Sequence, residues 1–132
     1  KANGASARAT WSNCSRPAME AITLLNTDPA RHEAFIKEQA EFAQSLADRA
    51  AIFTKEAAEV GLEVCPYHSG FFIFVPTPTH EDAVKMFDVL SEQNVFAVPL
   101  GSGMRIAICA VDDAMIPGMA TKFKNAYDKV CK

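Results

Sequence analysis

The 132-residue sequence has no run of apolar residues that approaches the roughly 20 needed to cross a bilayer as a helix. The segment from Lys1 to Thr10 also lacks the apolar core that a signal peptide requires. There is no excess of charge of one sign, because the formal net charge is only -3 at pH 7. No internal repeat or low-complexity segment occurs. Length, composition and charge therefore predict one globular domain with neither nucleic acid nor a membrane as a partner.

Motifs for common catalytic and metal sites are missing as well. The four cysteines form no C-x-x-C pair, and no histidine lies at zinc-finger spacing from them: Cys14, Cys65, Cys109 and Cys131. Cys65 and Cys109 lie in apolar stretches, where a free thiol behaves as a small hydrophobe. This pattern favours free cysteines in a reducing cytoplasm, with a disulfide pair as the alternative. The glycines of 101–103 are too few for a phosphate-binding loop and predict a plain turn.

The first 25 residues or so are predicted to form short secondary-structure elements. The stretch 1–13 is expected to hold the end of one element followed by a turn. Ser15 is expected to cap a short helix that runs to about Leu25, where Asn26 and Thr27 break it.

The clearest element is a helix predicted over 29–60, which Asp28 caps and Gly61 ends. Apolar residues at helical spacing mark one face of it: Phe35, Phe42, Leu46, Ala50, Phe53, Ala57 and Val60. At about 1.5 Å per residue the helix would be roughly 48 Å long, so it should overhang a compact domain or reach something outside the chain. Gln39 interrupts the stripe, and this uneven seam favours core packing over a coiled coil.

The C-terminal half alternates strands and helices. Strands are predicted over residues 62–65, 71–75, 95–98 and 104–111. Thr79, with Asp82 three residues later, is expected to cap the intervening helix. Asp112 or Asp113 is expected to cap the last helix, with Pro117 in its first turn or at a kink. This order predicts an α+β fold, in which a long N-terminal helix accompanies a small three- to four-stranded sheet covered by helices on one face.

Two arginines are candidates for ligand binding. Arg105 is the charged residue of the apolar strand 104–111, and a strand that is apolar on both faces is expected inside a sheet. A guanidinium there needs an anionic partner, and a ligand carboxylate would give it two parallel hydrogen bonds. The alternative is an arginine at a strand end that reaches solvent. Arg8 precedes residues 9–13, which by their spacing alone form an ordinary surface loop.

Several segments, taken in order, resemble class I pyridoxal-phosphate-dependent aminotransferases of the aspartate and aromatic type, which have fold type I. They are Ala7-Arg8-Ala9-Thr10-Trp11-Ser12-Asn13 with Arg16-Pro17-Ala18-Met19, Pro66-Tyr67-His68-Ser69-Gly70-Phe71-Phe72, and Gly103-Met104-Arg105-Ile106-Ala107-Ile108-Cys109. The resemblance covers essentially the whole chain and implies the C-terminal small domain of such an enzyme, residues 1–132. Residues 1–28 would be an interdomain and dimer-contact segment, 29–60 the long linking helix, and 61–132 the small-domain sheet and helices.

The resemblance also implies roles for individual residues. Arg105 matches the arginine that pairs with the α-carboxylate of the amino acid substrate. Arg8 matches the position that, in aspartate-type members, reaches into the neighbouring subunit and binds a distal carboxylate. Phe71 or Phe72 matches an aromatic residue near the substrate.

The remaining match lies in the loop after Arg8. Ser12 and Asn13 would lie near the cofactor edge at the dimer interface. Cys14 and Ser15 follow them where many relatives have prolines, a departure that bears on the local loop path and on aspartate specificity.

As a whole, the resemblance implies exchange of an amino group between an L-amino acid, of aspartate or aromatic type, and a 2-oxo acid. The full-length enzyme would be a cytoplasmic homodimer that uses pyridoxal 5'-phosphate. No segment of this chain matches the motif of the cofactor lysine, so the chain alone would hold no catalytic residue, bind no cofactor or metal and be inactive. The alternatives are a stand-alone regulatory α+β module that binds a small molecule, and a helical interaction module whose dimer seam is 29–60.

Overall fold

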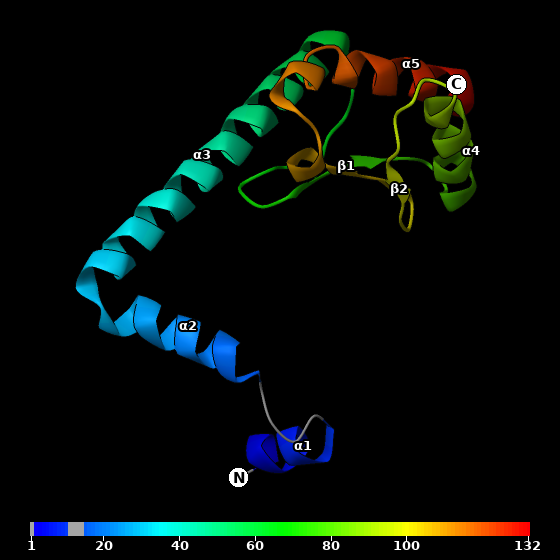
Figure 1. The fold of residues 1–132 in the computed structure, drawn as a ribbon. Coiled ribbons are helices and arrows are strands. Elements are labelled where there is room, and N and C mark those ends of the chain that lie inside the picture. Colours follow the sequence, from blue (N-terminus) through cyan, green and yellow to red (C-terminus); the bar gives the residue numbers. More distant parts are fainter. Residues whose placement is uncertain (1, 11–14) are drawn as a thin grey trace. The chain divides into compact units, whose positions relative to one another are not determined.

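The computed structural model describes residues 2–10 and 15–132. The chain divides into two compact units, Lys1–Phe42 and Ala43–Lys132 (Figure 1). The first unit contains helix α1 (Ala2–Thr10), helix α2 (Arg16–Thr27) and the beginning of helix α3 (Pro29–Val60). Helix α1 occupies the part of 1–13 where the end of an element was predicted, and the turn predicted after it lies outside the described residues. Four alanines in this segment explain the helix, since alanine has the highest helix propensity.

Helix α2 continues past Leu25, so the predicted break at Asn26 and Thr27 is wrong. The side-chain amide of Asn26 donates to the carbonyl of Ile22 at 2.7 Å, and the Thr27 hydroxyl donates to the carbonyl of Thr23 at 2.8 Å. Both side chains are therefore bonded one turn back along the helix, which ends at Thr27, two residues later than predicted.

The bounds predicted for α3 are confirmed at both ends. The Asp28 carboxylate accepts from the backbone amides of Ala30 and Arg31 at 3.0 and 3.3 Å, as an N-cap does. Gly61 has a φ of 69°, and the amide of Leu62 donates back to the carbonyl of Ala57 at 2.8 Å. Local capping chemistry thus fixes where this helix begins and ends.

The predicted apolar face of α3 is buried only in its C-terminal part. Ala50, Phe53 and Ala57 are buried there, and Leu46 and Val60 pack against the same core. At the other end of the stripe, Phe35 and Phe42 are 41% and 66% exposed. The stripe therefore contributes to the core of the second unit through residues after Phe42.

The second unit contains an antiparallel three-stranded sheet in the order β1-β3-β2, with β1 at Phe72–Pro76, β2 at Val98–Pro99 and β3 at Gly103–Ala107. The strand predicted over 62–65 is wrong, because this segment forms only one backbone hydrogen bond to the sheet, from the amide of Cys65 to the carbonyl of Phe74 at 2.9 Å. The prediction that Arg105 lies on an internal strand is confirmed, since β3 is central.

The last predicted strand is too long. Strand β3 ends at Ala107, and the chain turns into two short 3-10 helices, η1 (Ile108–Ala110) and η2 (Asp113–Met115). Helix α5 (Met119–Cys131) begins only after Gly118, whose φ is 84°. Asp112 and Asp113 therefore do not cap the last helix, because they lie at the start of η2, and Pro117 lies in the turn between η2 and α5.

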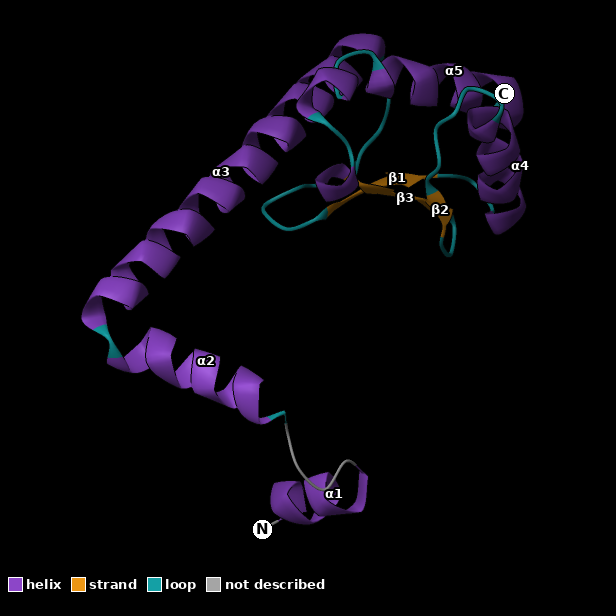
Figure 2. Cartoon of the chain, viewed as in Figure 1, coloured by secondary structure: helices purple, strands orange, loops and turns teal. Residues whose placement is uncertain are grey.

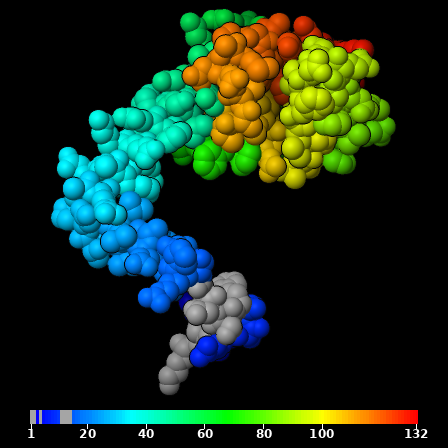
Figure 3. All heavy atoms as spheres, in the orientation of Figure 1, coloured from blue at the N-terminus to red at the C-terminus, as the bar shows by residue number. Residues whose placement is uncertain are grey.

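Helix α4 (His80–Ser91) begins as predicted. The Thr79 hydroxyl accepts from the amide of Asp82 at 3.1 Å, and the Asp82 carboxylate accepts from the amide of Thr79 at 3.1 Å. This reciprocal pair is a complete capping box. Helices α4 and α5 pack against each other, and Figure 3 shows the atoms of both on the same part of this unit.

The core lies between one face of the sheet and the helices. Ile73 and Val75 of β1 are paired with Ile106 and Met104 of β3, and all four are buried. Figure 2 shows α4, α5 and the C-terminal part of α3 on this side of the sheet, as predicted. The largest fully buried side chains are Phe53, Phe123, Ile73, Met86, Leu90, Met104, Ile108, Ile116 and Val75.

Glu56 joins α3 to the start of α5. Its carboxylate accepts from the backbone amides of Gly118 and Thr121, both at 2.9 Å, and from the Thr121 hydroxyl at 2.5 Å. Burial by itself raises the pKa of the Glu56 carboxyl, but the hydrogen bonds from Thr121, Gly118 and Ala120 together outweigh it and lower this pKa. The ionised carboxylate therefore caps α5 from a distant helix.

Replacing Glu56 with Gln should lower the free energy of unfolding by about 1–2 kcal/mol at neutral pH, the usual cost of losing a helix cap. The pKa of Glu56 is lower in the folded chain than in the unfolded chain. Its stabilisation is therefore present above the unfolded value of about 4.3 and is lost as pH falls through the folded value.

Urea unfolding at neutral pH and at about pH 3 measures both effects. The difference between the wild type and Glu56→Gln should shrink at the acidic pH. Glu59→Gln, which alters an exposed carboxylate on the same helix, is the control. Equal unfolding free energies for the two variants at neutral pH would contradict the assigned cap.

Candidate functional site

The face of the sheet opposite the core carries the candidate site. Strand residues alternate between two faces, so burying Met104 and Ile106 places Arg105 on the other side. The register pairs Arg105 with Phe74 of β1 and with Val98 of β2. Arg105 is half-buried and occupies the middle of the central strand. It is therefore not an arginine at a frayed strand end.

One aromatic ring lies against the Arg105 guanidinium, and a second ring packs on the first. Its Cζ atom lies 4.5 Å from the centre of the Phe72 ring, which is a cation–π distance. The rings of Phe71 and Phe72 have centroids 6.3 Å apart and planes at 77°, an edge-to-face arrangement. Among residues 2–10 and 15–132, no carboxylate forms an ion pair with Arg105. Its donors therefore remain available for an anionic ligand, which a carboxylate would satisfy through two parallel bonds.

The structure brings together three of the predicted site residues, Arg105, Phe71 and Phe72. Arg8 is exposed on α1, in the first unit. Ser12 and Asn13 lie outside the described residues, as does Trp11 between Arg8 and them.

The sequence analysis missed Arg49 on α3. Its Nη1 donates to the carbonyl of Ile108 at 3.2 Å and approaches that of Cys109 at 3.5 Å, and its Nε pairs with the Asp113 carboxylate at 2.5 Å. A signal was present, because Arg49 falls at helical spacing between Leu46 and Phe53 on the apolar face. A charge in such a stripe needs partners elsewhere in the fold.

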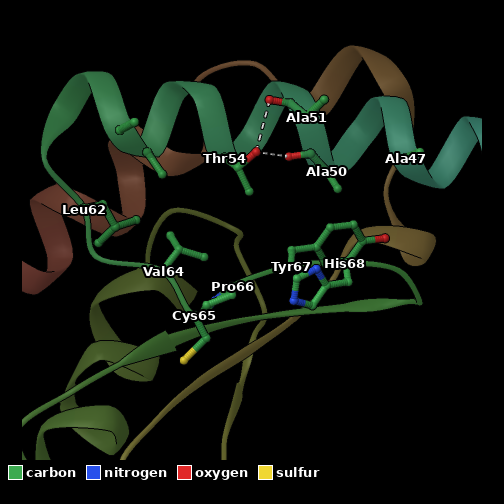
Figure 4. Close-up of a pocket in the computed structure, with 12 residues that line it drawn as sticks. Ala47, Ala50, Ala51, Thr54, Leu62, Val64, Cys65, Pro66, Tyr67 and His68 are labelled. Atoms are coloured by element: carbon green, nitrogen blue, oxygen red, sulfur yellow. Dashed lines mark hydrogen bonds between the residues drawn. The ribbon is translucent and has the colours of Figure 1, made fainter.

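A separate cleft of about 560 Å³ lies between α3 and the segment 62–68 (Figure 4). Small residues of α3 line one wall, and Tyr67 and His68 line the other. The Thr54 hydroxyl in this cleft is bonded to the carbonyls of Ala50 and Ala51 at 2.8 and 3.3 Å. The Tyr67 hydroxyl, likewise, donates to the carbonyl of Gly70 at 2.7 Å. The polar groups of Thr54 and Tyr67 therefore serve local structure.

The described part of the chain has no cluster of three or more side chains that could hold a metal ion. None of its helices has both the length and the apolar character of a membrane span. Cys65, Cys109 and Cys131 are free thiols, and Cys65 and Cys109 are exposed. The expectation that these two thiols behave like small hydrophobes of the apolar stretches around them is therefore not met, because Cys65 lies in the segment before β1 and Cys109 lies in η1 after β3.

Comparison with known proteins adds independent evidence. The family model described as "Aminotransferase class I and II" matches residues 4–123. The crystal structure of an aminotransferase from Anaerococcus prevotii is similar, with a TM-score of 0.86 and 30% identity over 93% of this chain. This chain spans only 29% of that protein. A search of curated proteins found no match.

Two more distant structures share the fold. An amino transferase from Eubacterium rectale has a TM-score of 0.55 and 21% identity, over 67% of this chain and 23% of its own. Lysine aminotransferase from M. tuberculosis has a TM-score of 0.53 and 20% identity, over 76% of this chain and 24% of its own.

The pairing of β1 with β3, which places Arg105 on the uncovered face, depends on the small size of Gly103. A Cβ added at Gly103 would lie 2.4 and 2.5 Å from two ring atoms of Phe74 and 2.6 Å from the carbonyl oxygen of Val75. Gly103→Ala should therefore push β1 and β3 apart and lower the free energy of unfolding by about 1–3 kcal/mol. Chemical denaturation measures this, with the exposed neighbour Ser102→Ala as control. Unfolding free energies that agree for the two variants would show that Phe74 moves aside at little cost.

Proposed function

This chain belongs to the class I and II aminotransferase family, and we propose that it is the C-terminal small domain of an enzyme that exchanges an amino group between an L-amino acid and a 2-oxo acid. Arg105 is the residue that carries this proposal. It binds the α-carboxylate common to all amino acid substrates. Arg105 acts by orientation, because a carboxylate held at two points fixes how the rest of the substrate faces the reacting groups.

The geometry of Arg105 supports this role over a purely structural one. A structural arginine in the middle of a sheet is expected to have a protein carboxylate as its partner. Arg105 instead contacts the face of the Phe72 ring, which holds the planar guanidinium while its edge stays free for a ligand. Phe71 and Phe72 then line the substrate's position beside the carboxylate.

The substrate preference follows from a second cation. We propose that Arg8 binds the distal carboxylate of an aspartate-type substrate from across a homodimer. An aromatic substrate would use the same pocket with Arg8 turned away. Ser12 and Asn13 are proposed to lie at the cofactor edge of that dimer interface.

Members of this family use pyridoxal phosphate, which supplies the electron sink for the substrate's α-carbon. The open sheet face does not fit the attachment of this cofactor. Its residues offer a guanidinium, aromatic rings and apolar side chains, and no amine occurs among Phe72, Phe74, Val98, Arg105 and Ala107. We therefore propose that the cofactor lysine belongs to a large domain outside this chain, and that the chain alone is inactive.

Exposed apolar residues support the proposed contacts with a large domain and a partner subunit. The first unit carries several large apolar side chains that are at least 41% exposed: Met19, Ile22, Leu24, Phe35, Ile36 and Phe42. Clustered exposure of this kind marks contact surfaces. We accordingly propose residues 1–28 as an interdomain and dimer-contact segment, 29–60 as the linking helix and 61–132 as the small-domain sheet and helices. We also propose that the full-length enzyme is cytoplasmic.

In the full-length enzyme, Arg105→Ala should lower kcat/KM for alanine by roughly 30- to several-thousand-fold, because truncating one partner of a charged pair costs about 2–5 kcal/mol. Arg105→Lys should restore only part of the activity, since an ammonium lacks the planar fork. Arg8→Ala should leave the alanine value unchanged and lower the aspartate value. Steady-state kinetics with alanine, phenylalanine and aspartate test this. An Arg105→Ala enzyme within about threefold of wild type for alanine, a loss below about 1 kcal/mol, would refute the role of Arg105.

The 132-residue chain by itself should not react with pyridoxal phosphate at one specific lysine. Incubation with the cofactor, reduction with borohydride and peptide mapping measure this. Scattered substoichiometric labelling of exposed lysines is the expected background. Stoichiometric labelling of a single lysine would place the attachment site inside this chain and contradict the proposal.

A further inference from the structure

Arg49 directs its side chain at the two short 3-10 helices that follow β3, η1 and η2. Although it lies on the apolar face of α3, only 19% of its side chain is exposed. Its Nη1 donates to the Ile108 carbonyl at 3.2 Å, and its Nε pairs with Asp113 at 2.5 Å. Removing a guanidinium from water is costly unless its donors are satisfied. These bonds therefore offset the cost in the turns η2 and η1, of which η1 directly follows β3.

That turn is also bonded to the aromatic side of the candidate site. The amide of Ile108 donates to the carbonyl of Phe71 at 3.0 Å, beyond the last ladder pair, Phe72 with Ala107. The residue Ile108 is thus held on both sides, its amide by Phe71 and its carbonyl by Arg49. Ile108 is also fully buried, so this turn cannot shift without disturbing the core.

The contacts continue to the guanidinium of Arg105. Phe71 packs edge-to-face against Phe72, and the Phe72 ring lies 4.5 Å from Arg105 Cζ. Arg105 lies on β3 three residues before Ile108, which is the first residue after that strand. The segment bonded to Arg49 is therefore connected to Arg105 both along the chain and through the two rings. We infer that Arg49 is a positioning residue, which touches neither substrate nor cofactor but holds the end of β3 so that Arg105 and Phe72 keep the orientation that binds a carboxylate. This inference rests on the proposed function of Arg105.

A second anchor on the same helix distinguishes positioning from general stability. Glu56 binds the first turn of α5 through Gly118 and Thr121. Neither residue belongs to β3 or to the aromatic group. Loss of Glu56 should thus weaken the fold and spare carboxylate binding, whereas loss of Arg49 should impair both. Glu56→Gln is therefore the matched control.

The experiment uses the full-length enzyme that contains this chain. Arg49→Met removes the charge and all donors while retaining an unbranched side chain. Its KM for alanine and its inhibition constant for propionate, an unreactive carboxylate, should rise by about 10- to 100-fold, the scale of a small misplacement in a binding site. Arg49→Lys should give an intermediate value, because an ammonium cannot reach Asp113 and the Ile108 carbonyl with the same fork. Glu56→Gln should remain within about twofold of wild type.

A double-mutant cycle tests whether Arg49 acts through Arg105. In an Arg105→Ala background, Arg49→Met should cause little further loss of kcat/KM for alanine, because the group it positions is gone. Additive losses would overturn the inference, as would equal increases in the propionate constant for Arg49→Met and Glu56→Gln.

If Arg49→Met does not fold, the same comparisons apply to Arg49→Lys. A wild-type enzyme without transamination would refute the proposed function instead, and an active wild type with an unchanged Arg49 variant would refute only the role of Arg49.

Discussion

The register between β1 and β3 is the constraint on which the rest of the second unit depends. It pairs Ile73 with Ile106 and Val75 with Met104, and these side chains form the sheet's contribution to the core. Because side chains alternate along a strand, the same register must place Arg105 on the uncovered face. A slip of one residue would bury the guanidinium and expose the core residues. Core packing and the candidate binding site are therefore consequences of a single pairing.

Helix α3 secures this sheet to the C-terminal segments through two polar residues with different effects. Glu56 caps α5 and so contributes to the stability of the helical layer. Arg49 holds the turn after β3 and so reaches the strand that carries Arg105. Both lie next to buried apolar residues, where an unpaired polar group would be costly. Their cost is offset by bonds to backbone groups that no regular element satisfies.

In the proposed enzyme, this chain would bind the substrate and a separate large domain would carry the cofactor. In this proposal Arg105 would bind and orient a carboxylate, for which a guanidinium on a rigid strand is well suited. The bond-making chemistry would require a cofactor that the open sheet face cannot attach. A stand-alone regulatory module would not be expected to contain a helix of 32 residues that is buried only in its C-terminal part, as α3 is. The long helix is instead consistent with a link between domains.

The sequence by itself determined the features that depend on neighbours along the chain. Asp28 and Gly61 fixed the ends of α3, and Thr79 with Asp82 fixed the start of α4, because capping bonds span only a few residues. The presence of Arg105 in an apolar strand was likewise visible in the sequence, as was its placement on an internal strand.

Only the tertiary structure decided where β3 ends, where α5 begins and which face Arg105 occupies. The apolar run 104–111 is compatible with one long strand, but β3 ends at Ala107, and the turn after it is bonded to Arg49, which is 59 residues away from Ile108. The segment 62–65 likewise has the composition of a strand but finds only one backbone partner in the sheet. Pairing, burial and long-range capping depend on residues that meet only in the folded chain, so no local pattern could specify them.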